Sequence, residues 1–260
     1  MPTFTAGLRV QSRVIGALMM RELLTRYGRH NIGFLWIMVE PLLFAVLVGI
    51  VWNFMWGSTK HGLGVMSFVI SGYIPMVLFR QSVNRAAGLF QANSGLMYHR
   101  QIKILDFVFV RFLIELIGHM IAYLFIAIVL AGLDLFPIPY DLGFMLLGGL
   151  YYAFFVLAMC CILAPLSETS EVVEKFLPVV TYLTIPFSGA FTLAEWLTPV
   201  ARNVTLLFPP VHAMEMMRFG LYGHAITPYF EYGYPLIVNA ALLAFGLLLC
   251  RRVRKTMVVE

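Results

Sequence analysis

Long runs of apolar residues with very few charges constrain this chain more than any other feature. The clearest run extends from Phe107 to Leu133, and Arg111 and Glu115 are its charged residues. A helix needs about 20 mostly apolar residues to cross the hydrocarbon core of a bilayer. A soluble domain carries roughly a quarter charged residues, whereas this chain of 260 residues is 12% charged and 61% hydrophobic. The sequence therefore predicts an integral membrane protein.

Six such runs predict six transmembrane helices in an all-α fold. The first run is about 34 Å long as a helix, which is enough to cross the hydrocarbon core. Proline and glycine interrupt the second and fifth runs, and we expect the second to continue past Arg80 and Arg85 as a polar helical extension. The predicted spans, within a six-span region over residues 34–250, are Phe34–Trp56, Val65–Phe79, Phe107–Leu133, Phe144–Leu166, Phe176–Leu193 and Tyr234–Cys250.

The N-terminal segment, residues 8–30, has the pattern of a cationic amphipathic helix. Val14 and Leu18 belong to its apolar side, and Arg9 and Arg13 to its polar side. A helix of this kind directly before a span typically lies in the membrane interface. The alternative is a helix of soluble type that packs on its neighbours. The start of the chain lacks the apolar core and cleavage site of a signal peptide, so none is expected.

The basic residues are distributed unevenly between the two sides of the predicted topology. Of the 18 Lys and Arg residues, all but Lys60, Arg202 and Arg218 lie on one side. The positive-inside rule places that side in the cytoplasm. Both termini are therefore predicted to be cytoplasmic, and topology explains the net charge of +5 without nucleic-acid binding.

Residues 194–233, between the last two predicted spans, are expected to form structure on the outer side. Trp196–Phe208 and Val211–Tyr222 are apolar but too short to span, and Pro209-Pro210 separates them. This pattern suggests a re-entrant or interfacial helical hairpin, with an ordinary periplasmic cap as the alternative. Glu215 and Arg218 lie three positions apart on the second of these helices. They would form either a local ion pair or a contact with a ligand. The candidate outer-face residues are Ser188, Glu215 and Arg218.

The chain shows no recognisable catalytic constellation. It has no glycine-rich nucleotide loop, and its six histidines lack metal-ligand spacing. Glu168, Glu171 and Glu174 recur at intervals of three, as in some intramembrane metalloenzymes. Acids in the first turn of a capped helix explain them more simply. We therefore expect no catalytic, cofactor or metal site in this chain.

Glu40 lies inside the first apolar run, directly before Pro41. A carboxylate at the centre of a membrane helix costs roughly 2.5–3.5 kcal/mol on insertion scales, so it should face protein or water. One interpretation is a protonated structural acid bonded to a neighbouring helix, and the other is a group that faces a pore or another subunit. The candidate residues for a substrate path are Arg29, Trp36, Glu40, Arg80 and Arg85.

The sequence from Arg26 to Trp36, followed by Glu40-Pro41-Leu42, carries the strongest motif. It resembles the start of the permease of ABC-2 type polysaccharide exporters, particularly the capsular-polysaccharide branch of Gram-negative bacteria. Chain length, six spans and the outer segment from Phe208 to Arg218 fit the same family. Pro209-Pro210 departs from it, because Asn-Pro is expected there.

The resemblance implies a homodimer in the bacterial inner membrane, paired with two copies of a cytoplasmic ATPase that binds ATP and Mg²⁺. It also implies a lipid-linked acidic polysaccharide as cargo, and periplasmic and outer-membrane partners. Residues 94–105 would contain a coupling helix seated in the ATPase, and residues 8–30 would border the entry for the lipid-linked end. The coupling candidates are Leu96, Met97, Tyr98, His99 and Arg100.

Four arginines, Arg29, Arg80, Arg85 and Arg100, are hypothesised to attract the phosphate or acidic sugars of the cargo at the cytoplasmic mouth. Their alternative role is simply to determine topology. One rival function is a permease for O-antigen, teichoic acid or another ABC-2 substrate. The other is a membrane enzyme acting on lipid-linked sugars through the three neighbouring glutamates.

Overall fold

The computed structural model describes residues 4–27, 32–93, 95 and 103–257. These residues form a helical bundle with one short antiparallel hairpin, β1 (Thr59–Lys60) and β2 (Leu63–Gly64). The helices are α1 (Phe4–Tyr27), α2 (Ile32–Trp56), α3 (Val65–Ala86), α5 (Ile104–Ala131), α6 (Leu142–Thr169), α7 (Glu171–Leu183), α8 (Pro199–Thr205), α9 (Pro209–Tyr222) and α10 (Gly233–Met257). Single 3-10 turns occur at Gln91–Asn93, Ile185–Phe187, Ala194–Trp196 and Gly223–Ala225.

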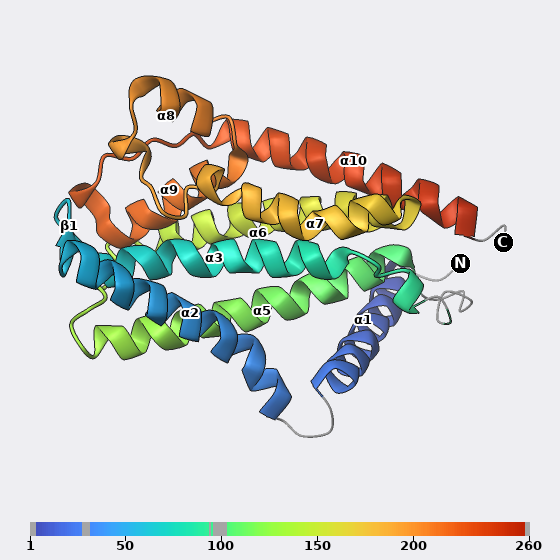
Figure 1. Ribbon diagram of the computed structural model, residues 1–260. Helices are drawn as coiled ribbons and strands as arrows, with labels where there is room; N and C mark the ends of the chain where they lie inside the picture. Colours follow the sequence, from blue (N-terminus) through green and yellow to red (C-terminus); the bar gives the residue numbers. More distant parts are fainter. Residues whose placement is uncertain (1–3, 28–31, 94, 96–102, 258–260) are drawn as a thin grey trace.

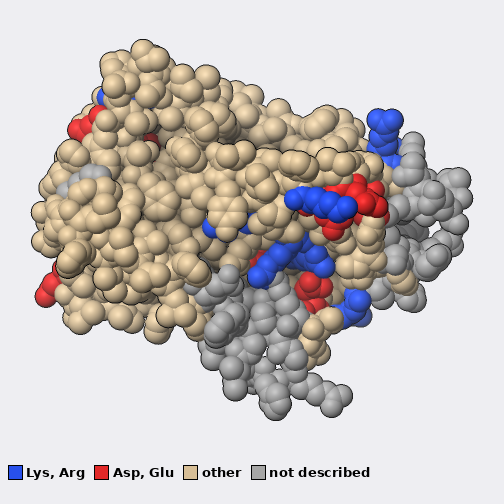
Figure 2. Space-filling view, viewed as in Figure 1, with Lys and Arg blue, Asp and Glu red and all other residues tan. Residues whose placement is uncertain are grey.

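The long helices run along the bundle, and its two ends differ in character (Figure 1). The start of α1 and the end of α10 lie at one end, whereas α8, α9 and the hairpin lie at the other. Figure 2 shows most of the charged side chains of one face toward the end with α1, a few at the opposite end, and a broad uncharged zone between them. This distribution suits a bundle whose middle lies in an apolar medium.

Three helices of the described chain are long and apolar enough to cross a membrane, namely Ile104–Ala131, Leu142–Thr169 and Gly233–Val253. They match the third, fourth and sixth predicted spans. Helix α2 contains a shorter apolar stretch, Leu42–Trp56. The total of six spans stays a prediction, because α3 and α7 carry polar residues along much of their length.

The structure confirms the polar extension of the second run and corrects the fifth. Helix α3 continues through Arg80 and Arg85 to Ala86. Helix α7 begins at Glu171 and ends at Leu183, so the predicted helix up to Leu193 is wrong. The chain instead turns through Ile185–Phe187 and reaches Gly189 with φ +71°, a conformation that glycine adopts without strain.

The outer segment packs closely on the bundle. Two prolines occupy the first turn of α9, where their missing N–H groups cost no hydrogen bond. Helix α9 is buried along nearly its whole length and packs against α6. A Cβ at Gly148 of α6 would lie 2.6 Å from the Met217 nitrogen, so glycine permits this close approach of two backbones. The first short helix is smaller than predicted, because α8 covers only Pro199–Thr205.

Helix α1 lies across the bundle at an oblique angle, against α5 (Figure 1). Leu18 is buried, and Val14, Ile15, Met19 and Leu23 pack against the core, which matches the predicted apolar side. The helix begins at Phe4, four residues before the predicted start. Polar side chains of α1 also bond to α5 and to the 3-10 turn after α3.

Candidate functional site

A polar cavity of about 370 Å³ opens between α2, α3 and α7. Helix α3 supplies most of its wall, since its contributing residues recur at helical spacing along one face. Phe44 of α2 and Tyr182 of α7 complete it. The α3 residues that line the cavity are Tyr73, Val77, Arg80, Gln81, Asn84 and Arg85.

Arg80 is held in this cavity by α7. Its Cζ lies 4.0 Å from the centroid of the Tyr182 ring, a cation–π contact. The neighbouring Thr181 hydroxyl donates to Asn84 Oδ1 at 3.4 Å, so α7 also bonds to the polar face of α3. Within the described chain, the Nε–H of Arg80 and Oε1 of Gln81 are buried without a hydrogen-bond partner. Buried polar groups are normally satisfied, so this wall is suited to a polar occupant.

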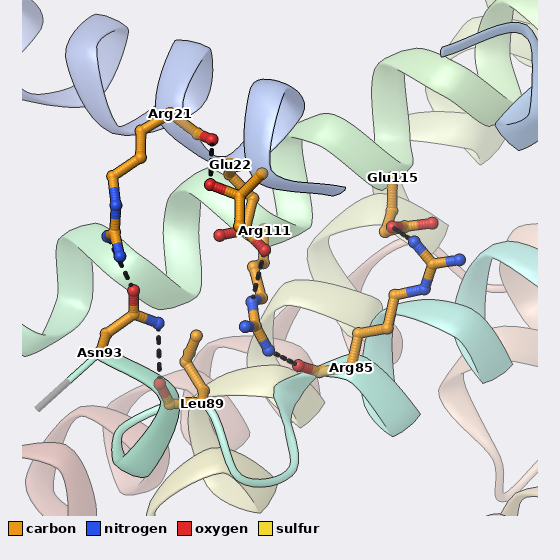
Figure 3. A network of polar contacts seen from close by, with 8 residues as sticks. Arg21, Glu22, Arg85, Leu89, Asn93, Arg111 and Glu115 are labelled. Carbon is orange, nitrogen blue, oxygen red and sulfur yellow. Dashed lines mark hydrogen bonds and ion pairs between the residues drawn. The ribbon is translucent and has the colours of Figure 1, made fainter. Parts of the chain in front are cut away.

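Arg85 lines the cavity and also forms an ion pair with a buried acid (Figure 3). Its Nη1 lies 2.7 Å from Glu115 Oε1 on α5. The Glu115 side chain is only 1% exposed, whereas the Arg85 side chain is 28% exposed. One turn further along α5, His119 Nδ1 lies 3.9 Å from the second carboxylate oxygen. Two charged side chains and a histidine therefore meet beside the cavity.

Arg111 connects this ion pair to α1 (Figure 3). Its Nε donates to Glu22 of α1 at 3.1 Å, and its Nη1 donates to the carbonyl oxygen of Arg85. A second contact runs from Arg21 Nη1 to Asn93 Oδ1, at 3.0 Å. The polar side of α1 is thus bonded to α5 and to the chain that follows α3.

The outer-face candidates hold a turn of the chain in place. Arg218 is fully buried and donates to the carbonyl oxygens of Gly189, at 2.6 Å, and Thr192, at 2.9 Å, and also to that of Ala190. Its Cζ lies 4.1 Å from the centroid of the Phe68 ring. Burial lowers the pKa of Arg218 to about 10, so it remains charged at neutral pH.

Glu215 and Ser188 bind the same region from two sides. Glu215 accepts from the backbone nitrogens of Ala194, at 3.0 Å, and Tyr229, at 3.4 Å. The Ser188 hydroxyl accepts from the Ala190 nitrogen at 3.2 Å. Glu215 and Arg218 therefore bind backbone groups, and no ion pair joins these two described side chains. Their observed contacts fasten the turn after α7 onto α9.

The remaining predicted residues divide into two sets. Arg29 and the five coupling candidates, Leu96, Met97, Tyr98, His99 and Arg100, lie outside the described residues. Trp36 and Glu40 belong to α2, but their side chains are outside the described part. The glutamate trio is split, because Glu168 lies near the end of α6 while Glu171 and Glu174 begin α7. Across the described chain, no cluster of acids, histidines or cysteines is placed to hold a metal ion.

Sequence reasoning missed Glu115, His119 and Tyr182 as members of the site. Glu115 carried the same signal as Glu40, an acid inside an apolar run, which indicates a protein-facing or water-facing group. Tyr182 carried no such signal, because aromatic residues are common in membrane helices.

Comparisons with known proteins cover nearly the whole chain. The family model described as ABC-2 type transporter matches residues 13–222. The chain is 36% identical over 97% of its length to the capsule polysaccharide export inner-membrane protein BexB of Haemophilus influenzae, and the match covers 96% of that protein. Identity and coverage are the same for CtrC, the capsule polysaccharide export inner-membrane protein of Neisseria meningitidis serogroup B. The polysialic acid transport protein KpsM of Escherichia coli is 24% identical over 98% of the chain and 99% of its own length.

Proposed function

The chain belongs to the ABC-2 type transporter family, and we propose that it is the inner-membrane permease of a capsular-polysaccharide exporter. The observation that carries this beyond family membership is the polar cavity with two arginines inside an apolar bundle. Buried charges in membrane proteins are costly and commonly mark the path of a polar substrate.

The cargo is a lipid-linked acidic polysaccharide, and its negative groups pass Arg80 and Arg85. Two guanidinium groups match carboxylates or phosphates by charge and by hydrogen-bond geometry. Tyr73 and Tyr182 add aromatic rings to the same wall, on which the apolar faces of sugar rings can stack. Arg29 and Arg100 extend the positive charge toward the cytoplasmic mouth in this proposal.

A separate cytoplasmic ATPase provides the energy. Two copies of it bind ATP and Mg²⁺ and act on a homodimer of this chain, with residues 94–105 seated in the ATPase. The basic residue distribution supports placing both termini on that cytoplasmic side. ATP-driven closure moves the coupling segment, and α2, α3 and α7 reshape a channel between the two permease copies. Periplasmic and outer-membrane proteins complete export.

Complementation tests the proposal directly. A capsule-forming bacterium whose own permease has been deleted should regain surface capsule when this chain is produced with its ATPase. Arg80→Gln combined with Arg85→Gln should lower surface capsule strongly when strains with equal amounts of the membrane-inserted protein are compared. Lys175→Gln, which removes an exposed cation of α7, should leave it unchanged. Capsule that is unaffected by the double substitution would contradict the proposed path.

Biochemistry distinguishes this function from a membrane enzyme. The purified chain should retain the ATPase through purification and should not alter a lipid-linked sugar by itself. Turnover of such a lipid by the chain alone would contradict the assignment as a permease.

A further inference from the structure

We infer that Glu115 is a built-in counter-ion of Arg85, and that an oxyanion of the cargo takes its place when the cavity is filled. This inference rests on the proposed function. Arg85 lines the cavity and also contacts Glu115 at 2.7 Å. One guanidinium therefore faces both the space for a ligand and a buried carboxylate.

The exposure of the two partners determines which of them a ligand reaches. Glu115 is closed off within the protein, at 1% exposed, while Arg85 keeps 28% of its side chain accessible. An anion that enters the cavity therefore meets the guanidinium and not the acid. A guanidinium has five N–H donors in a planar fork, so it can bind an incoming oxyanion while its bond to Glu115 is still forming or breaking.

The charges of the wall favour this exchange. Arg80 supplies a second cation that has no ion-pair partner among the described residues, and Tyr182 holds it in position. The wall therefore carries two guanidinium groups, and the one that belongs to Arg85 is bonded to Glu115. A carboxylate of an acidic sugar and a phosphate of the lipid-linked end share the required chemistry, which is an oxyanion that accepts from guanidinium.

The displaced carboxylate remains near another group of α5. His119 Nδ1 lies 2.9 Å from the Glu115 backbone oxygen and 3.9 Å from Glu115 Oε2, so the imidazole is bonded to the Glu115 main chain and lies beside the carboxylate. A buried acid is strongly unfavourable when it loses its partner. This cost makes the Arg85–Glu115 pair the resting state and makes release of the ligand favourable.

Arg111 gives the exchange a route to α1. It donates to the backbone carbonyl oxygen of Arg85 and also binds Glu22, so the last turn of α3, which carries the ligand-facing guanidinium, is linked through Arg111 to α1 (Figure 3). Occupancy of the cavity is thereby coupled to the helix that precedes the first predicted span. A physical coupling of this kind requires that both ends respond to the same ligand.

Equilibrium binding to the full permease–ATPase complex in lipid nanodiscs tests the counter-ion. The probes are a sialic-acid trimer, which carries carboxylates, and glycerol phosphate. At least one should bind the unmodified complex, and the probe that binds identifies the source of the oxyanion. Glu115→Gln should tighten that binding by about fivefold or more, since a competing carboxylate is removed. Arg85→Gln combined with Glu115→Gln should abolish this increase in affinity. Lys175→Gln should leave binding of the probe unchanged.

A second variant guards against simple misfolding. Glu115→Asp keeps the charge on a shorter side chain, so it should bind the probe more nearly as the unmodified complex does. If Glu115→Gln is folded but binds no more tightly, or if neither probe binds the unmodified complex, the counter-ion inference is wrong. Restored capsule in the complementation experiment would then still support the proposed function, so the two failures are distinguishable.

Hydrogen exchange of residues 4–27 tests the coupling to α1. Addition of the bound probe should change exchange in this segment of the unmodified complex, and Arg111→Gln should remove that change while the probe still binds. An identical response in both proteins would overturn the coupling.

Discussion

Arg111 of α5 donates through Nε to the Glu22 carboxylate of α1 at 3.1 Å, and the pair is largely shielded from water. The two residues are 89 positions apart in the sequence. The same guanidinium also satisfies the carbonyl oxygen of Arg85 near the end of α3. One arginine therefore attaches the amphipathic helix to the wall of the polar cavity.

Glu22→Gln is expected to loosen α1 without unfolding the bundle. A hydrogen bond to a charged group contributes about 1.5–3 kcal/mol, and α1 has further apolar contacts through Leu18. Hydrogen exchange across residues 4–27 should accelerate while exchange in α6 stays unchanged. Arg13→Gln, at an exposed position of the same helix, is the control. Equal exchange in both variants would show that the pair does not anchor α1.

Arg218→Met should destabilise the outer end of the bundle severely. Three backbone carbonyl oxygens would lose their buried donor, and each unsatisfied acceptor costs about 1–3 kcal/mol. Arg218→Lys should recover little, because an ammonium does not reproduce the planar fork of donors or its stacking on Phe68. Thermal unfolding in detergent measures both, against Arg251→Gln at an exposed position. Unfolding of Arg218→Met at the unmodified temperature would refute the clamp.

Gly72→Ala should disturb the same turn from the side of α3. A Cβ at Gly72 would overlap the carbonyl oxygen of Ala190, which Arg218 also binds. Forcing a methyl group into a packed contact costs about 1–3 kcal/mol, so the melting temperature should fall. Gly149→Ala is a matched control, because a Cβ there has no neighbour within 4 Å. This control should be neutral or stabilising by up to about 1 kcal/mol. If Gly72→Ala and the unmodified protein had equal melting temperatures, the turn would be able to move and accommodate the methyl group without loss of stability.

His212 on α9 should make stability depend on pH. The Glu231 backbone nitrogen donates to His212 Nδ1 at 3.0 Å, so the neutral ring carries its proton on Nε2, 2.7 Å from the Leu206 oxygen. Burial lowers the pKa of His212 below its ordinary value of about 6.5. The unfolded chain therefore takes up a proton first as the pH falls. The stability that the neutral His212 ring contributes should be fully present above about pH 6.5. It should decrease as the pH falls through the lowered pKa.

Thermal unfolding of the solubilised chain between pH 8 and pH 5 measures this dependence. His212→Gln keeps one donor and one acceptor but does not titrate, so it should flatten the lower part of the curve. Parallel curves for the two proteins would assign the pH dependence to other groups.

The polar site shows where reasoning from sequence stops. Arg80 and Arg85 were recognisable because both are charged and follow an apolar run. Their partners were not, because Tyr182 and Glu115 lie on other helices and no local pattern links them to α3. The position of Arg85 in the cavity wall likewise depends on which side of α3 faces α2 and α7. Sequence spacing specifies a helix face, but not the helix that packs against it.

The sequence by itself determined that the chain is an apolar helical membrane protein. Charged residues are costly to place in hydrocarbon, and they are correspondingly rare within each apolar run. It also determined the amphipathic pattern of α1, which depends on neighbours three and four positions away. Tertiary structure alone decided that α7 ends at Leu183 and that Arg218 clamps the turn beyond it. It also brought Arg85 and Glu115 together from positions 30 residues apart. These features arise from packing between distant segments, where close approach and the need to satisfy buried polar groups select one arrangement.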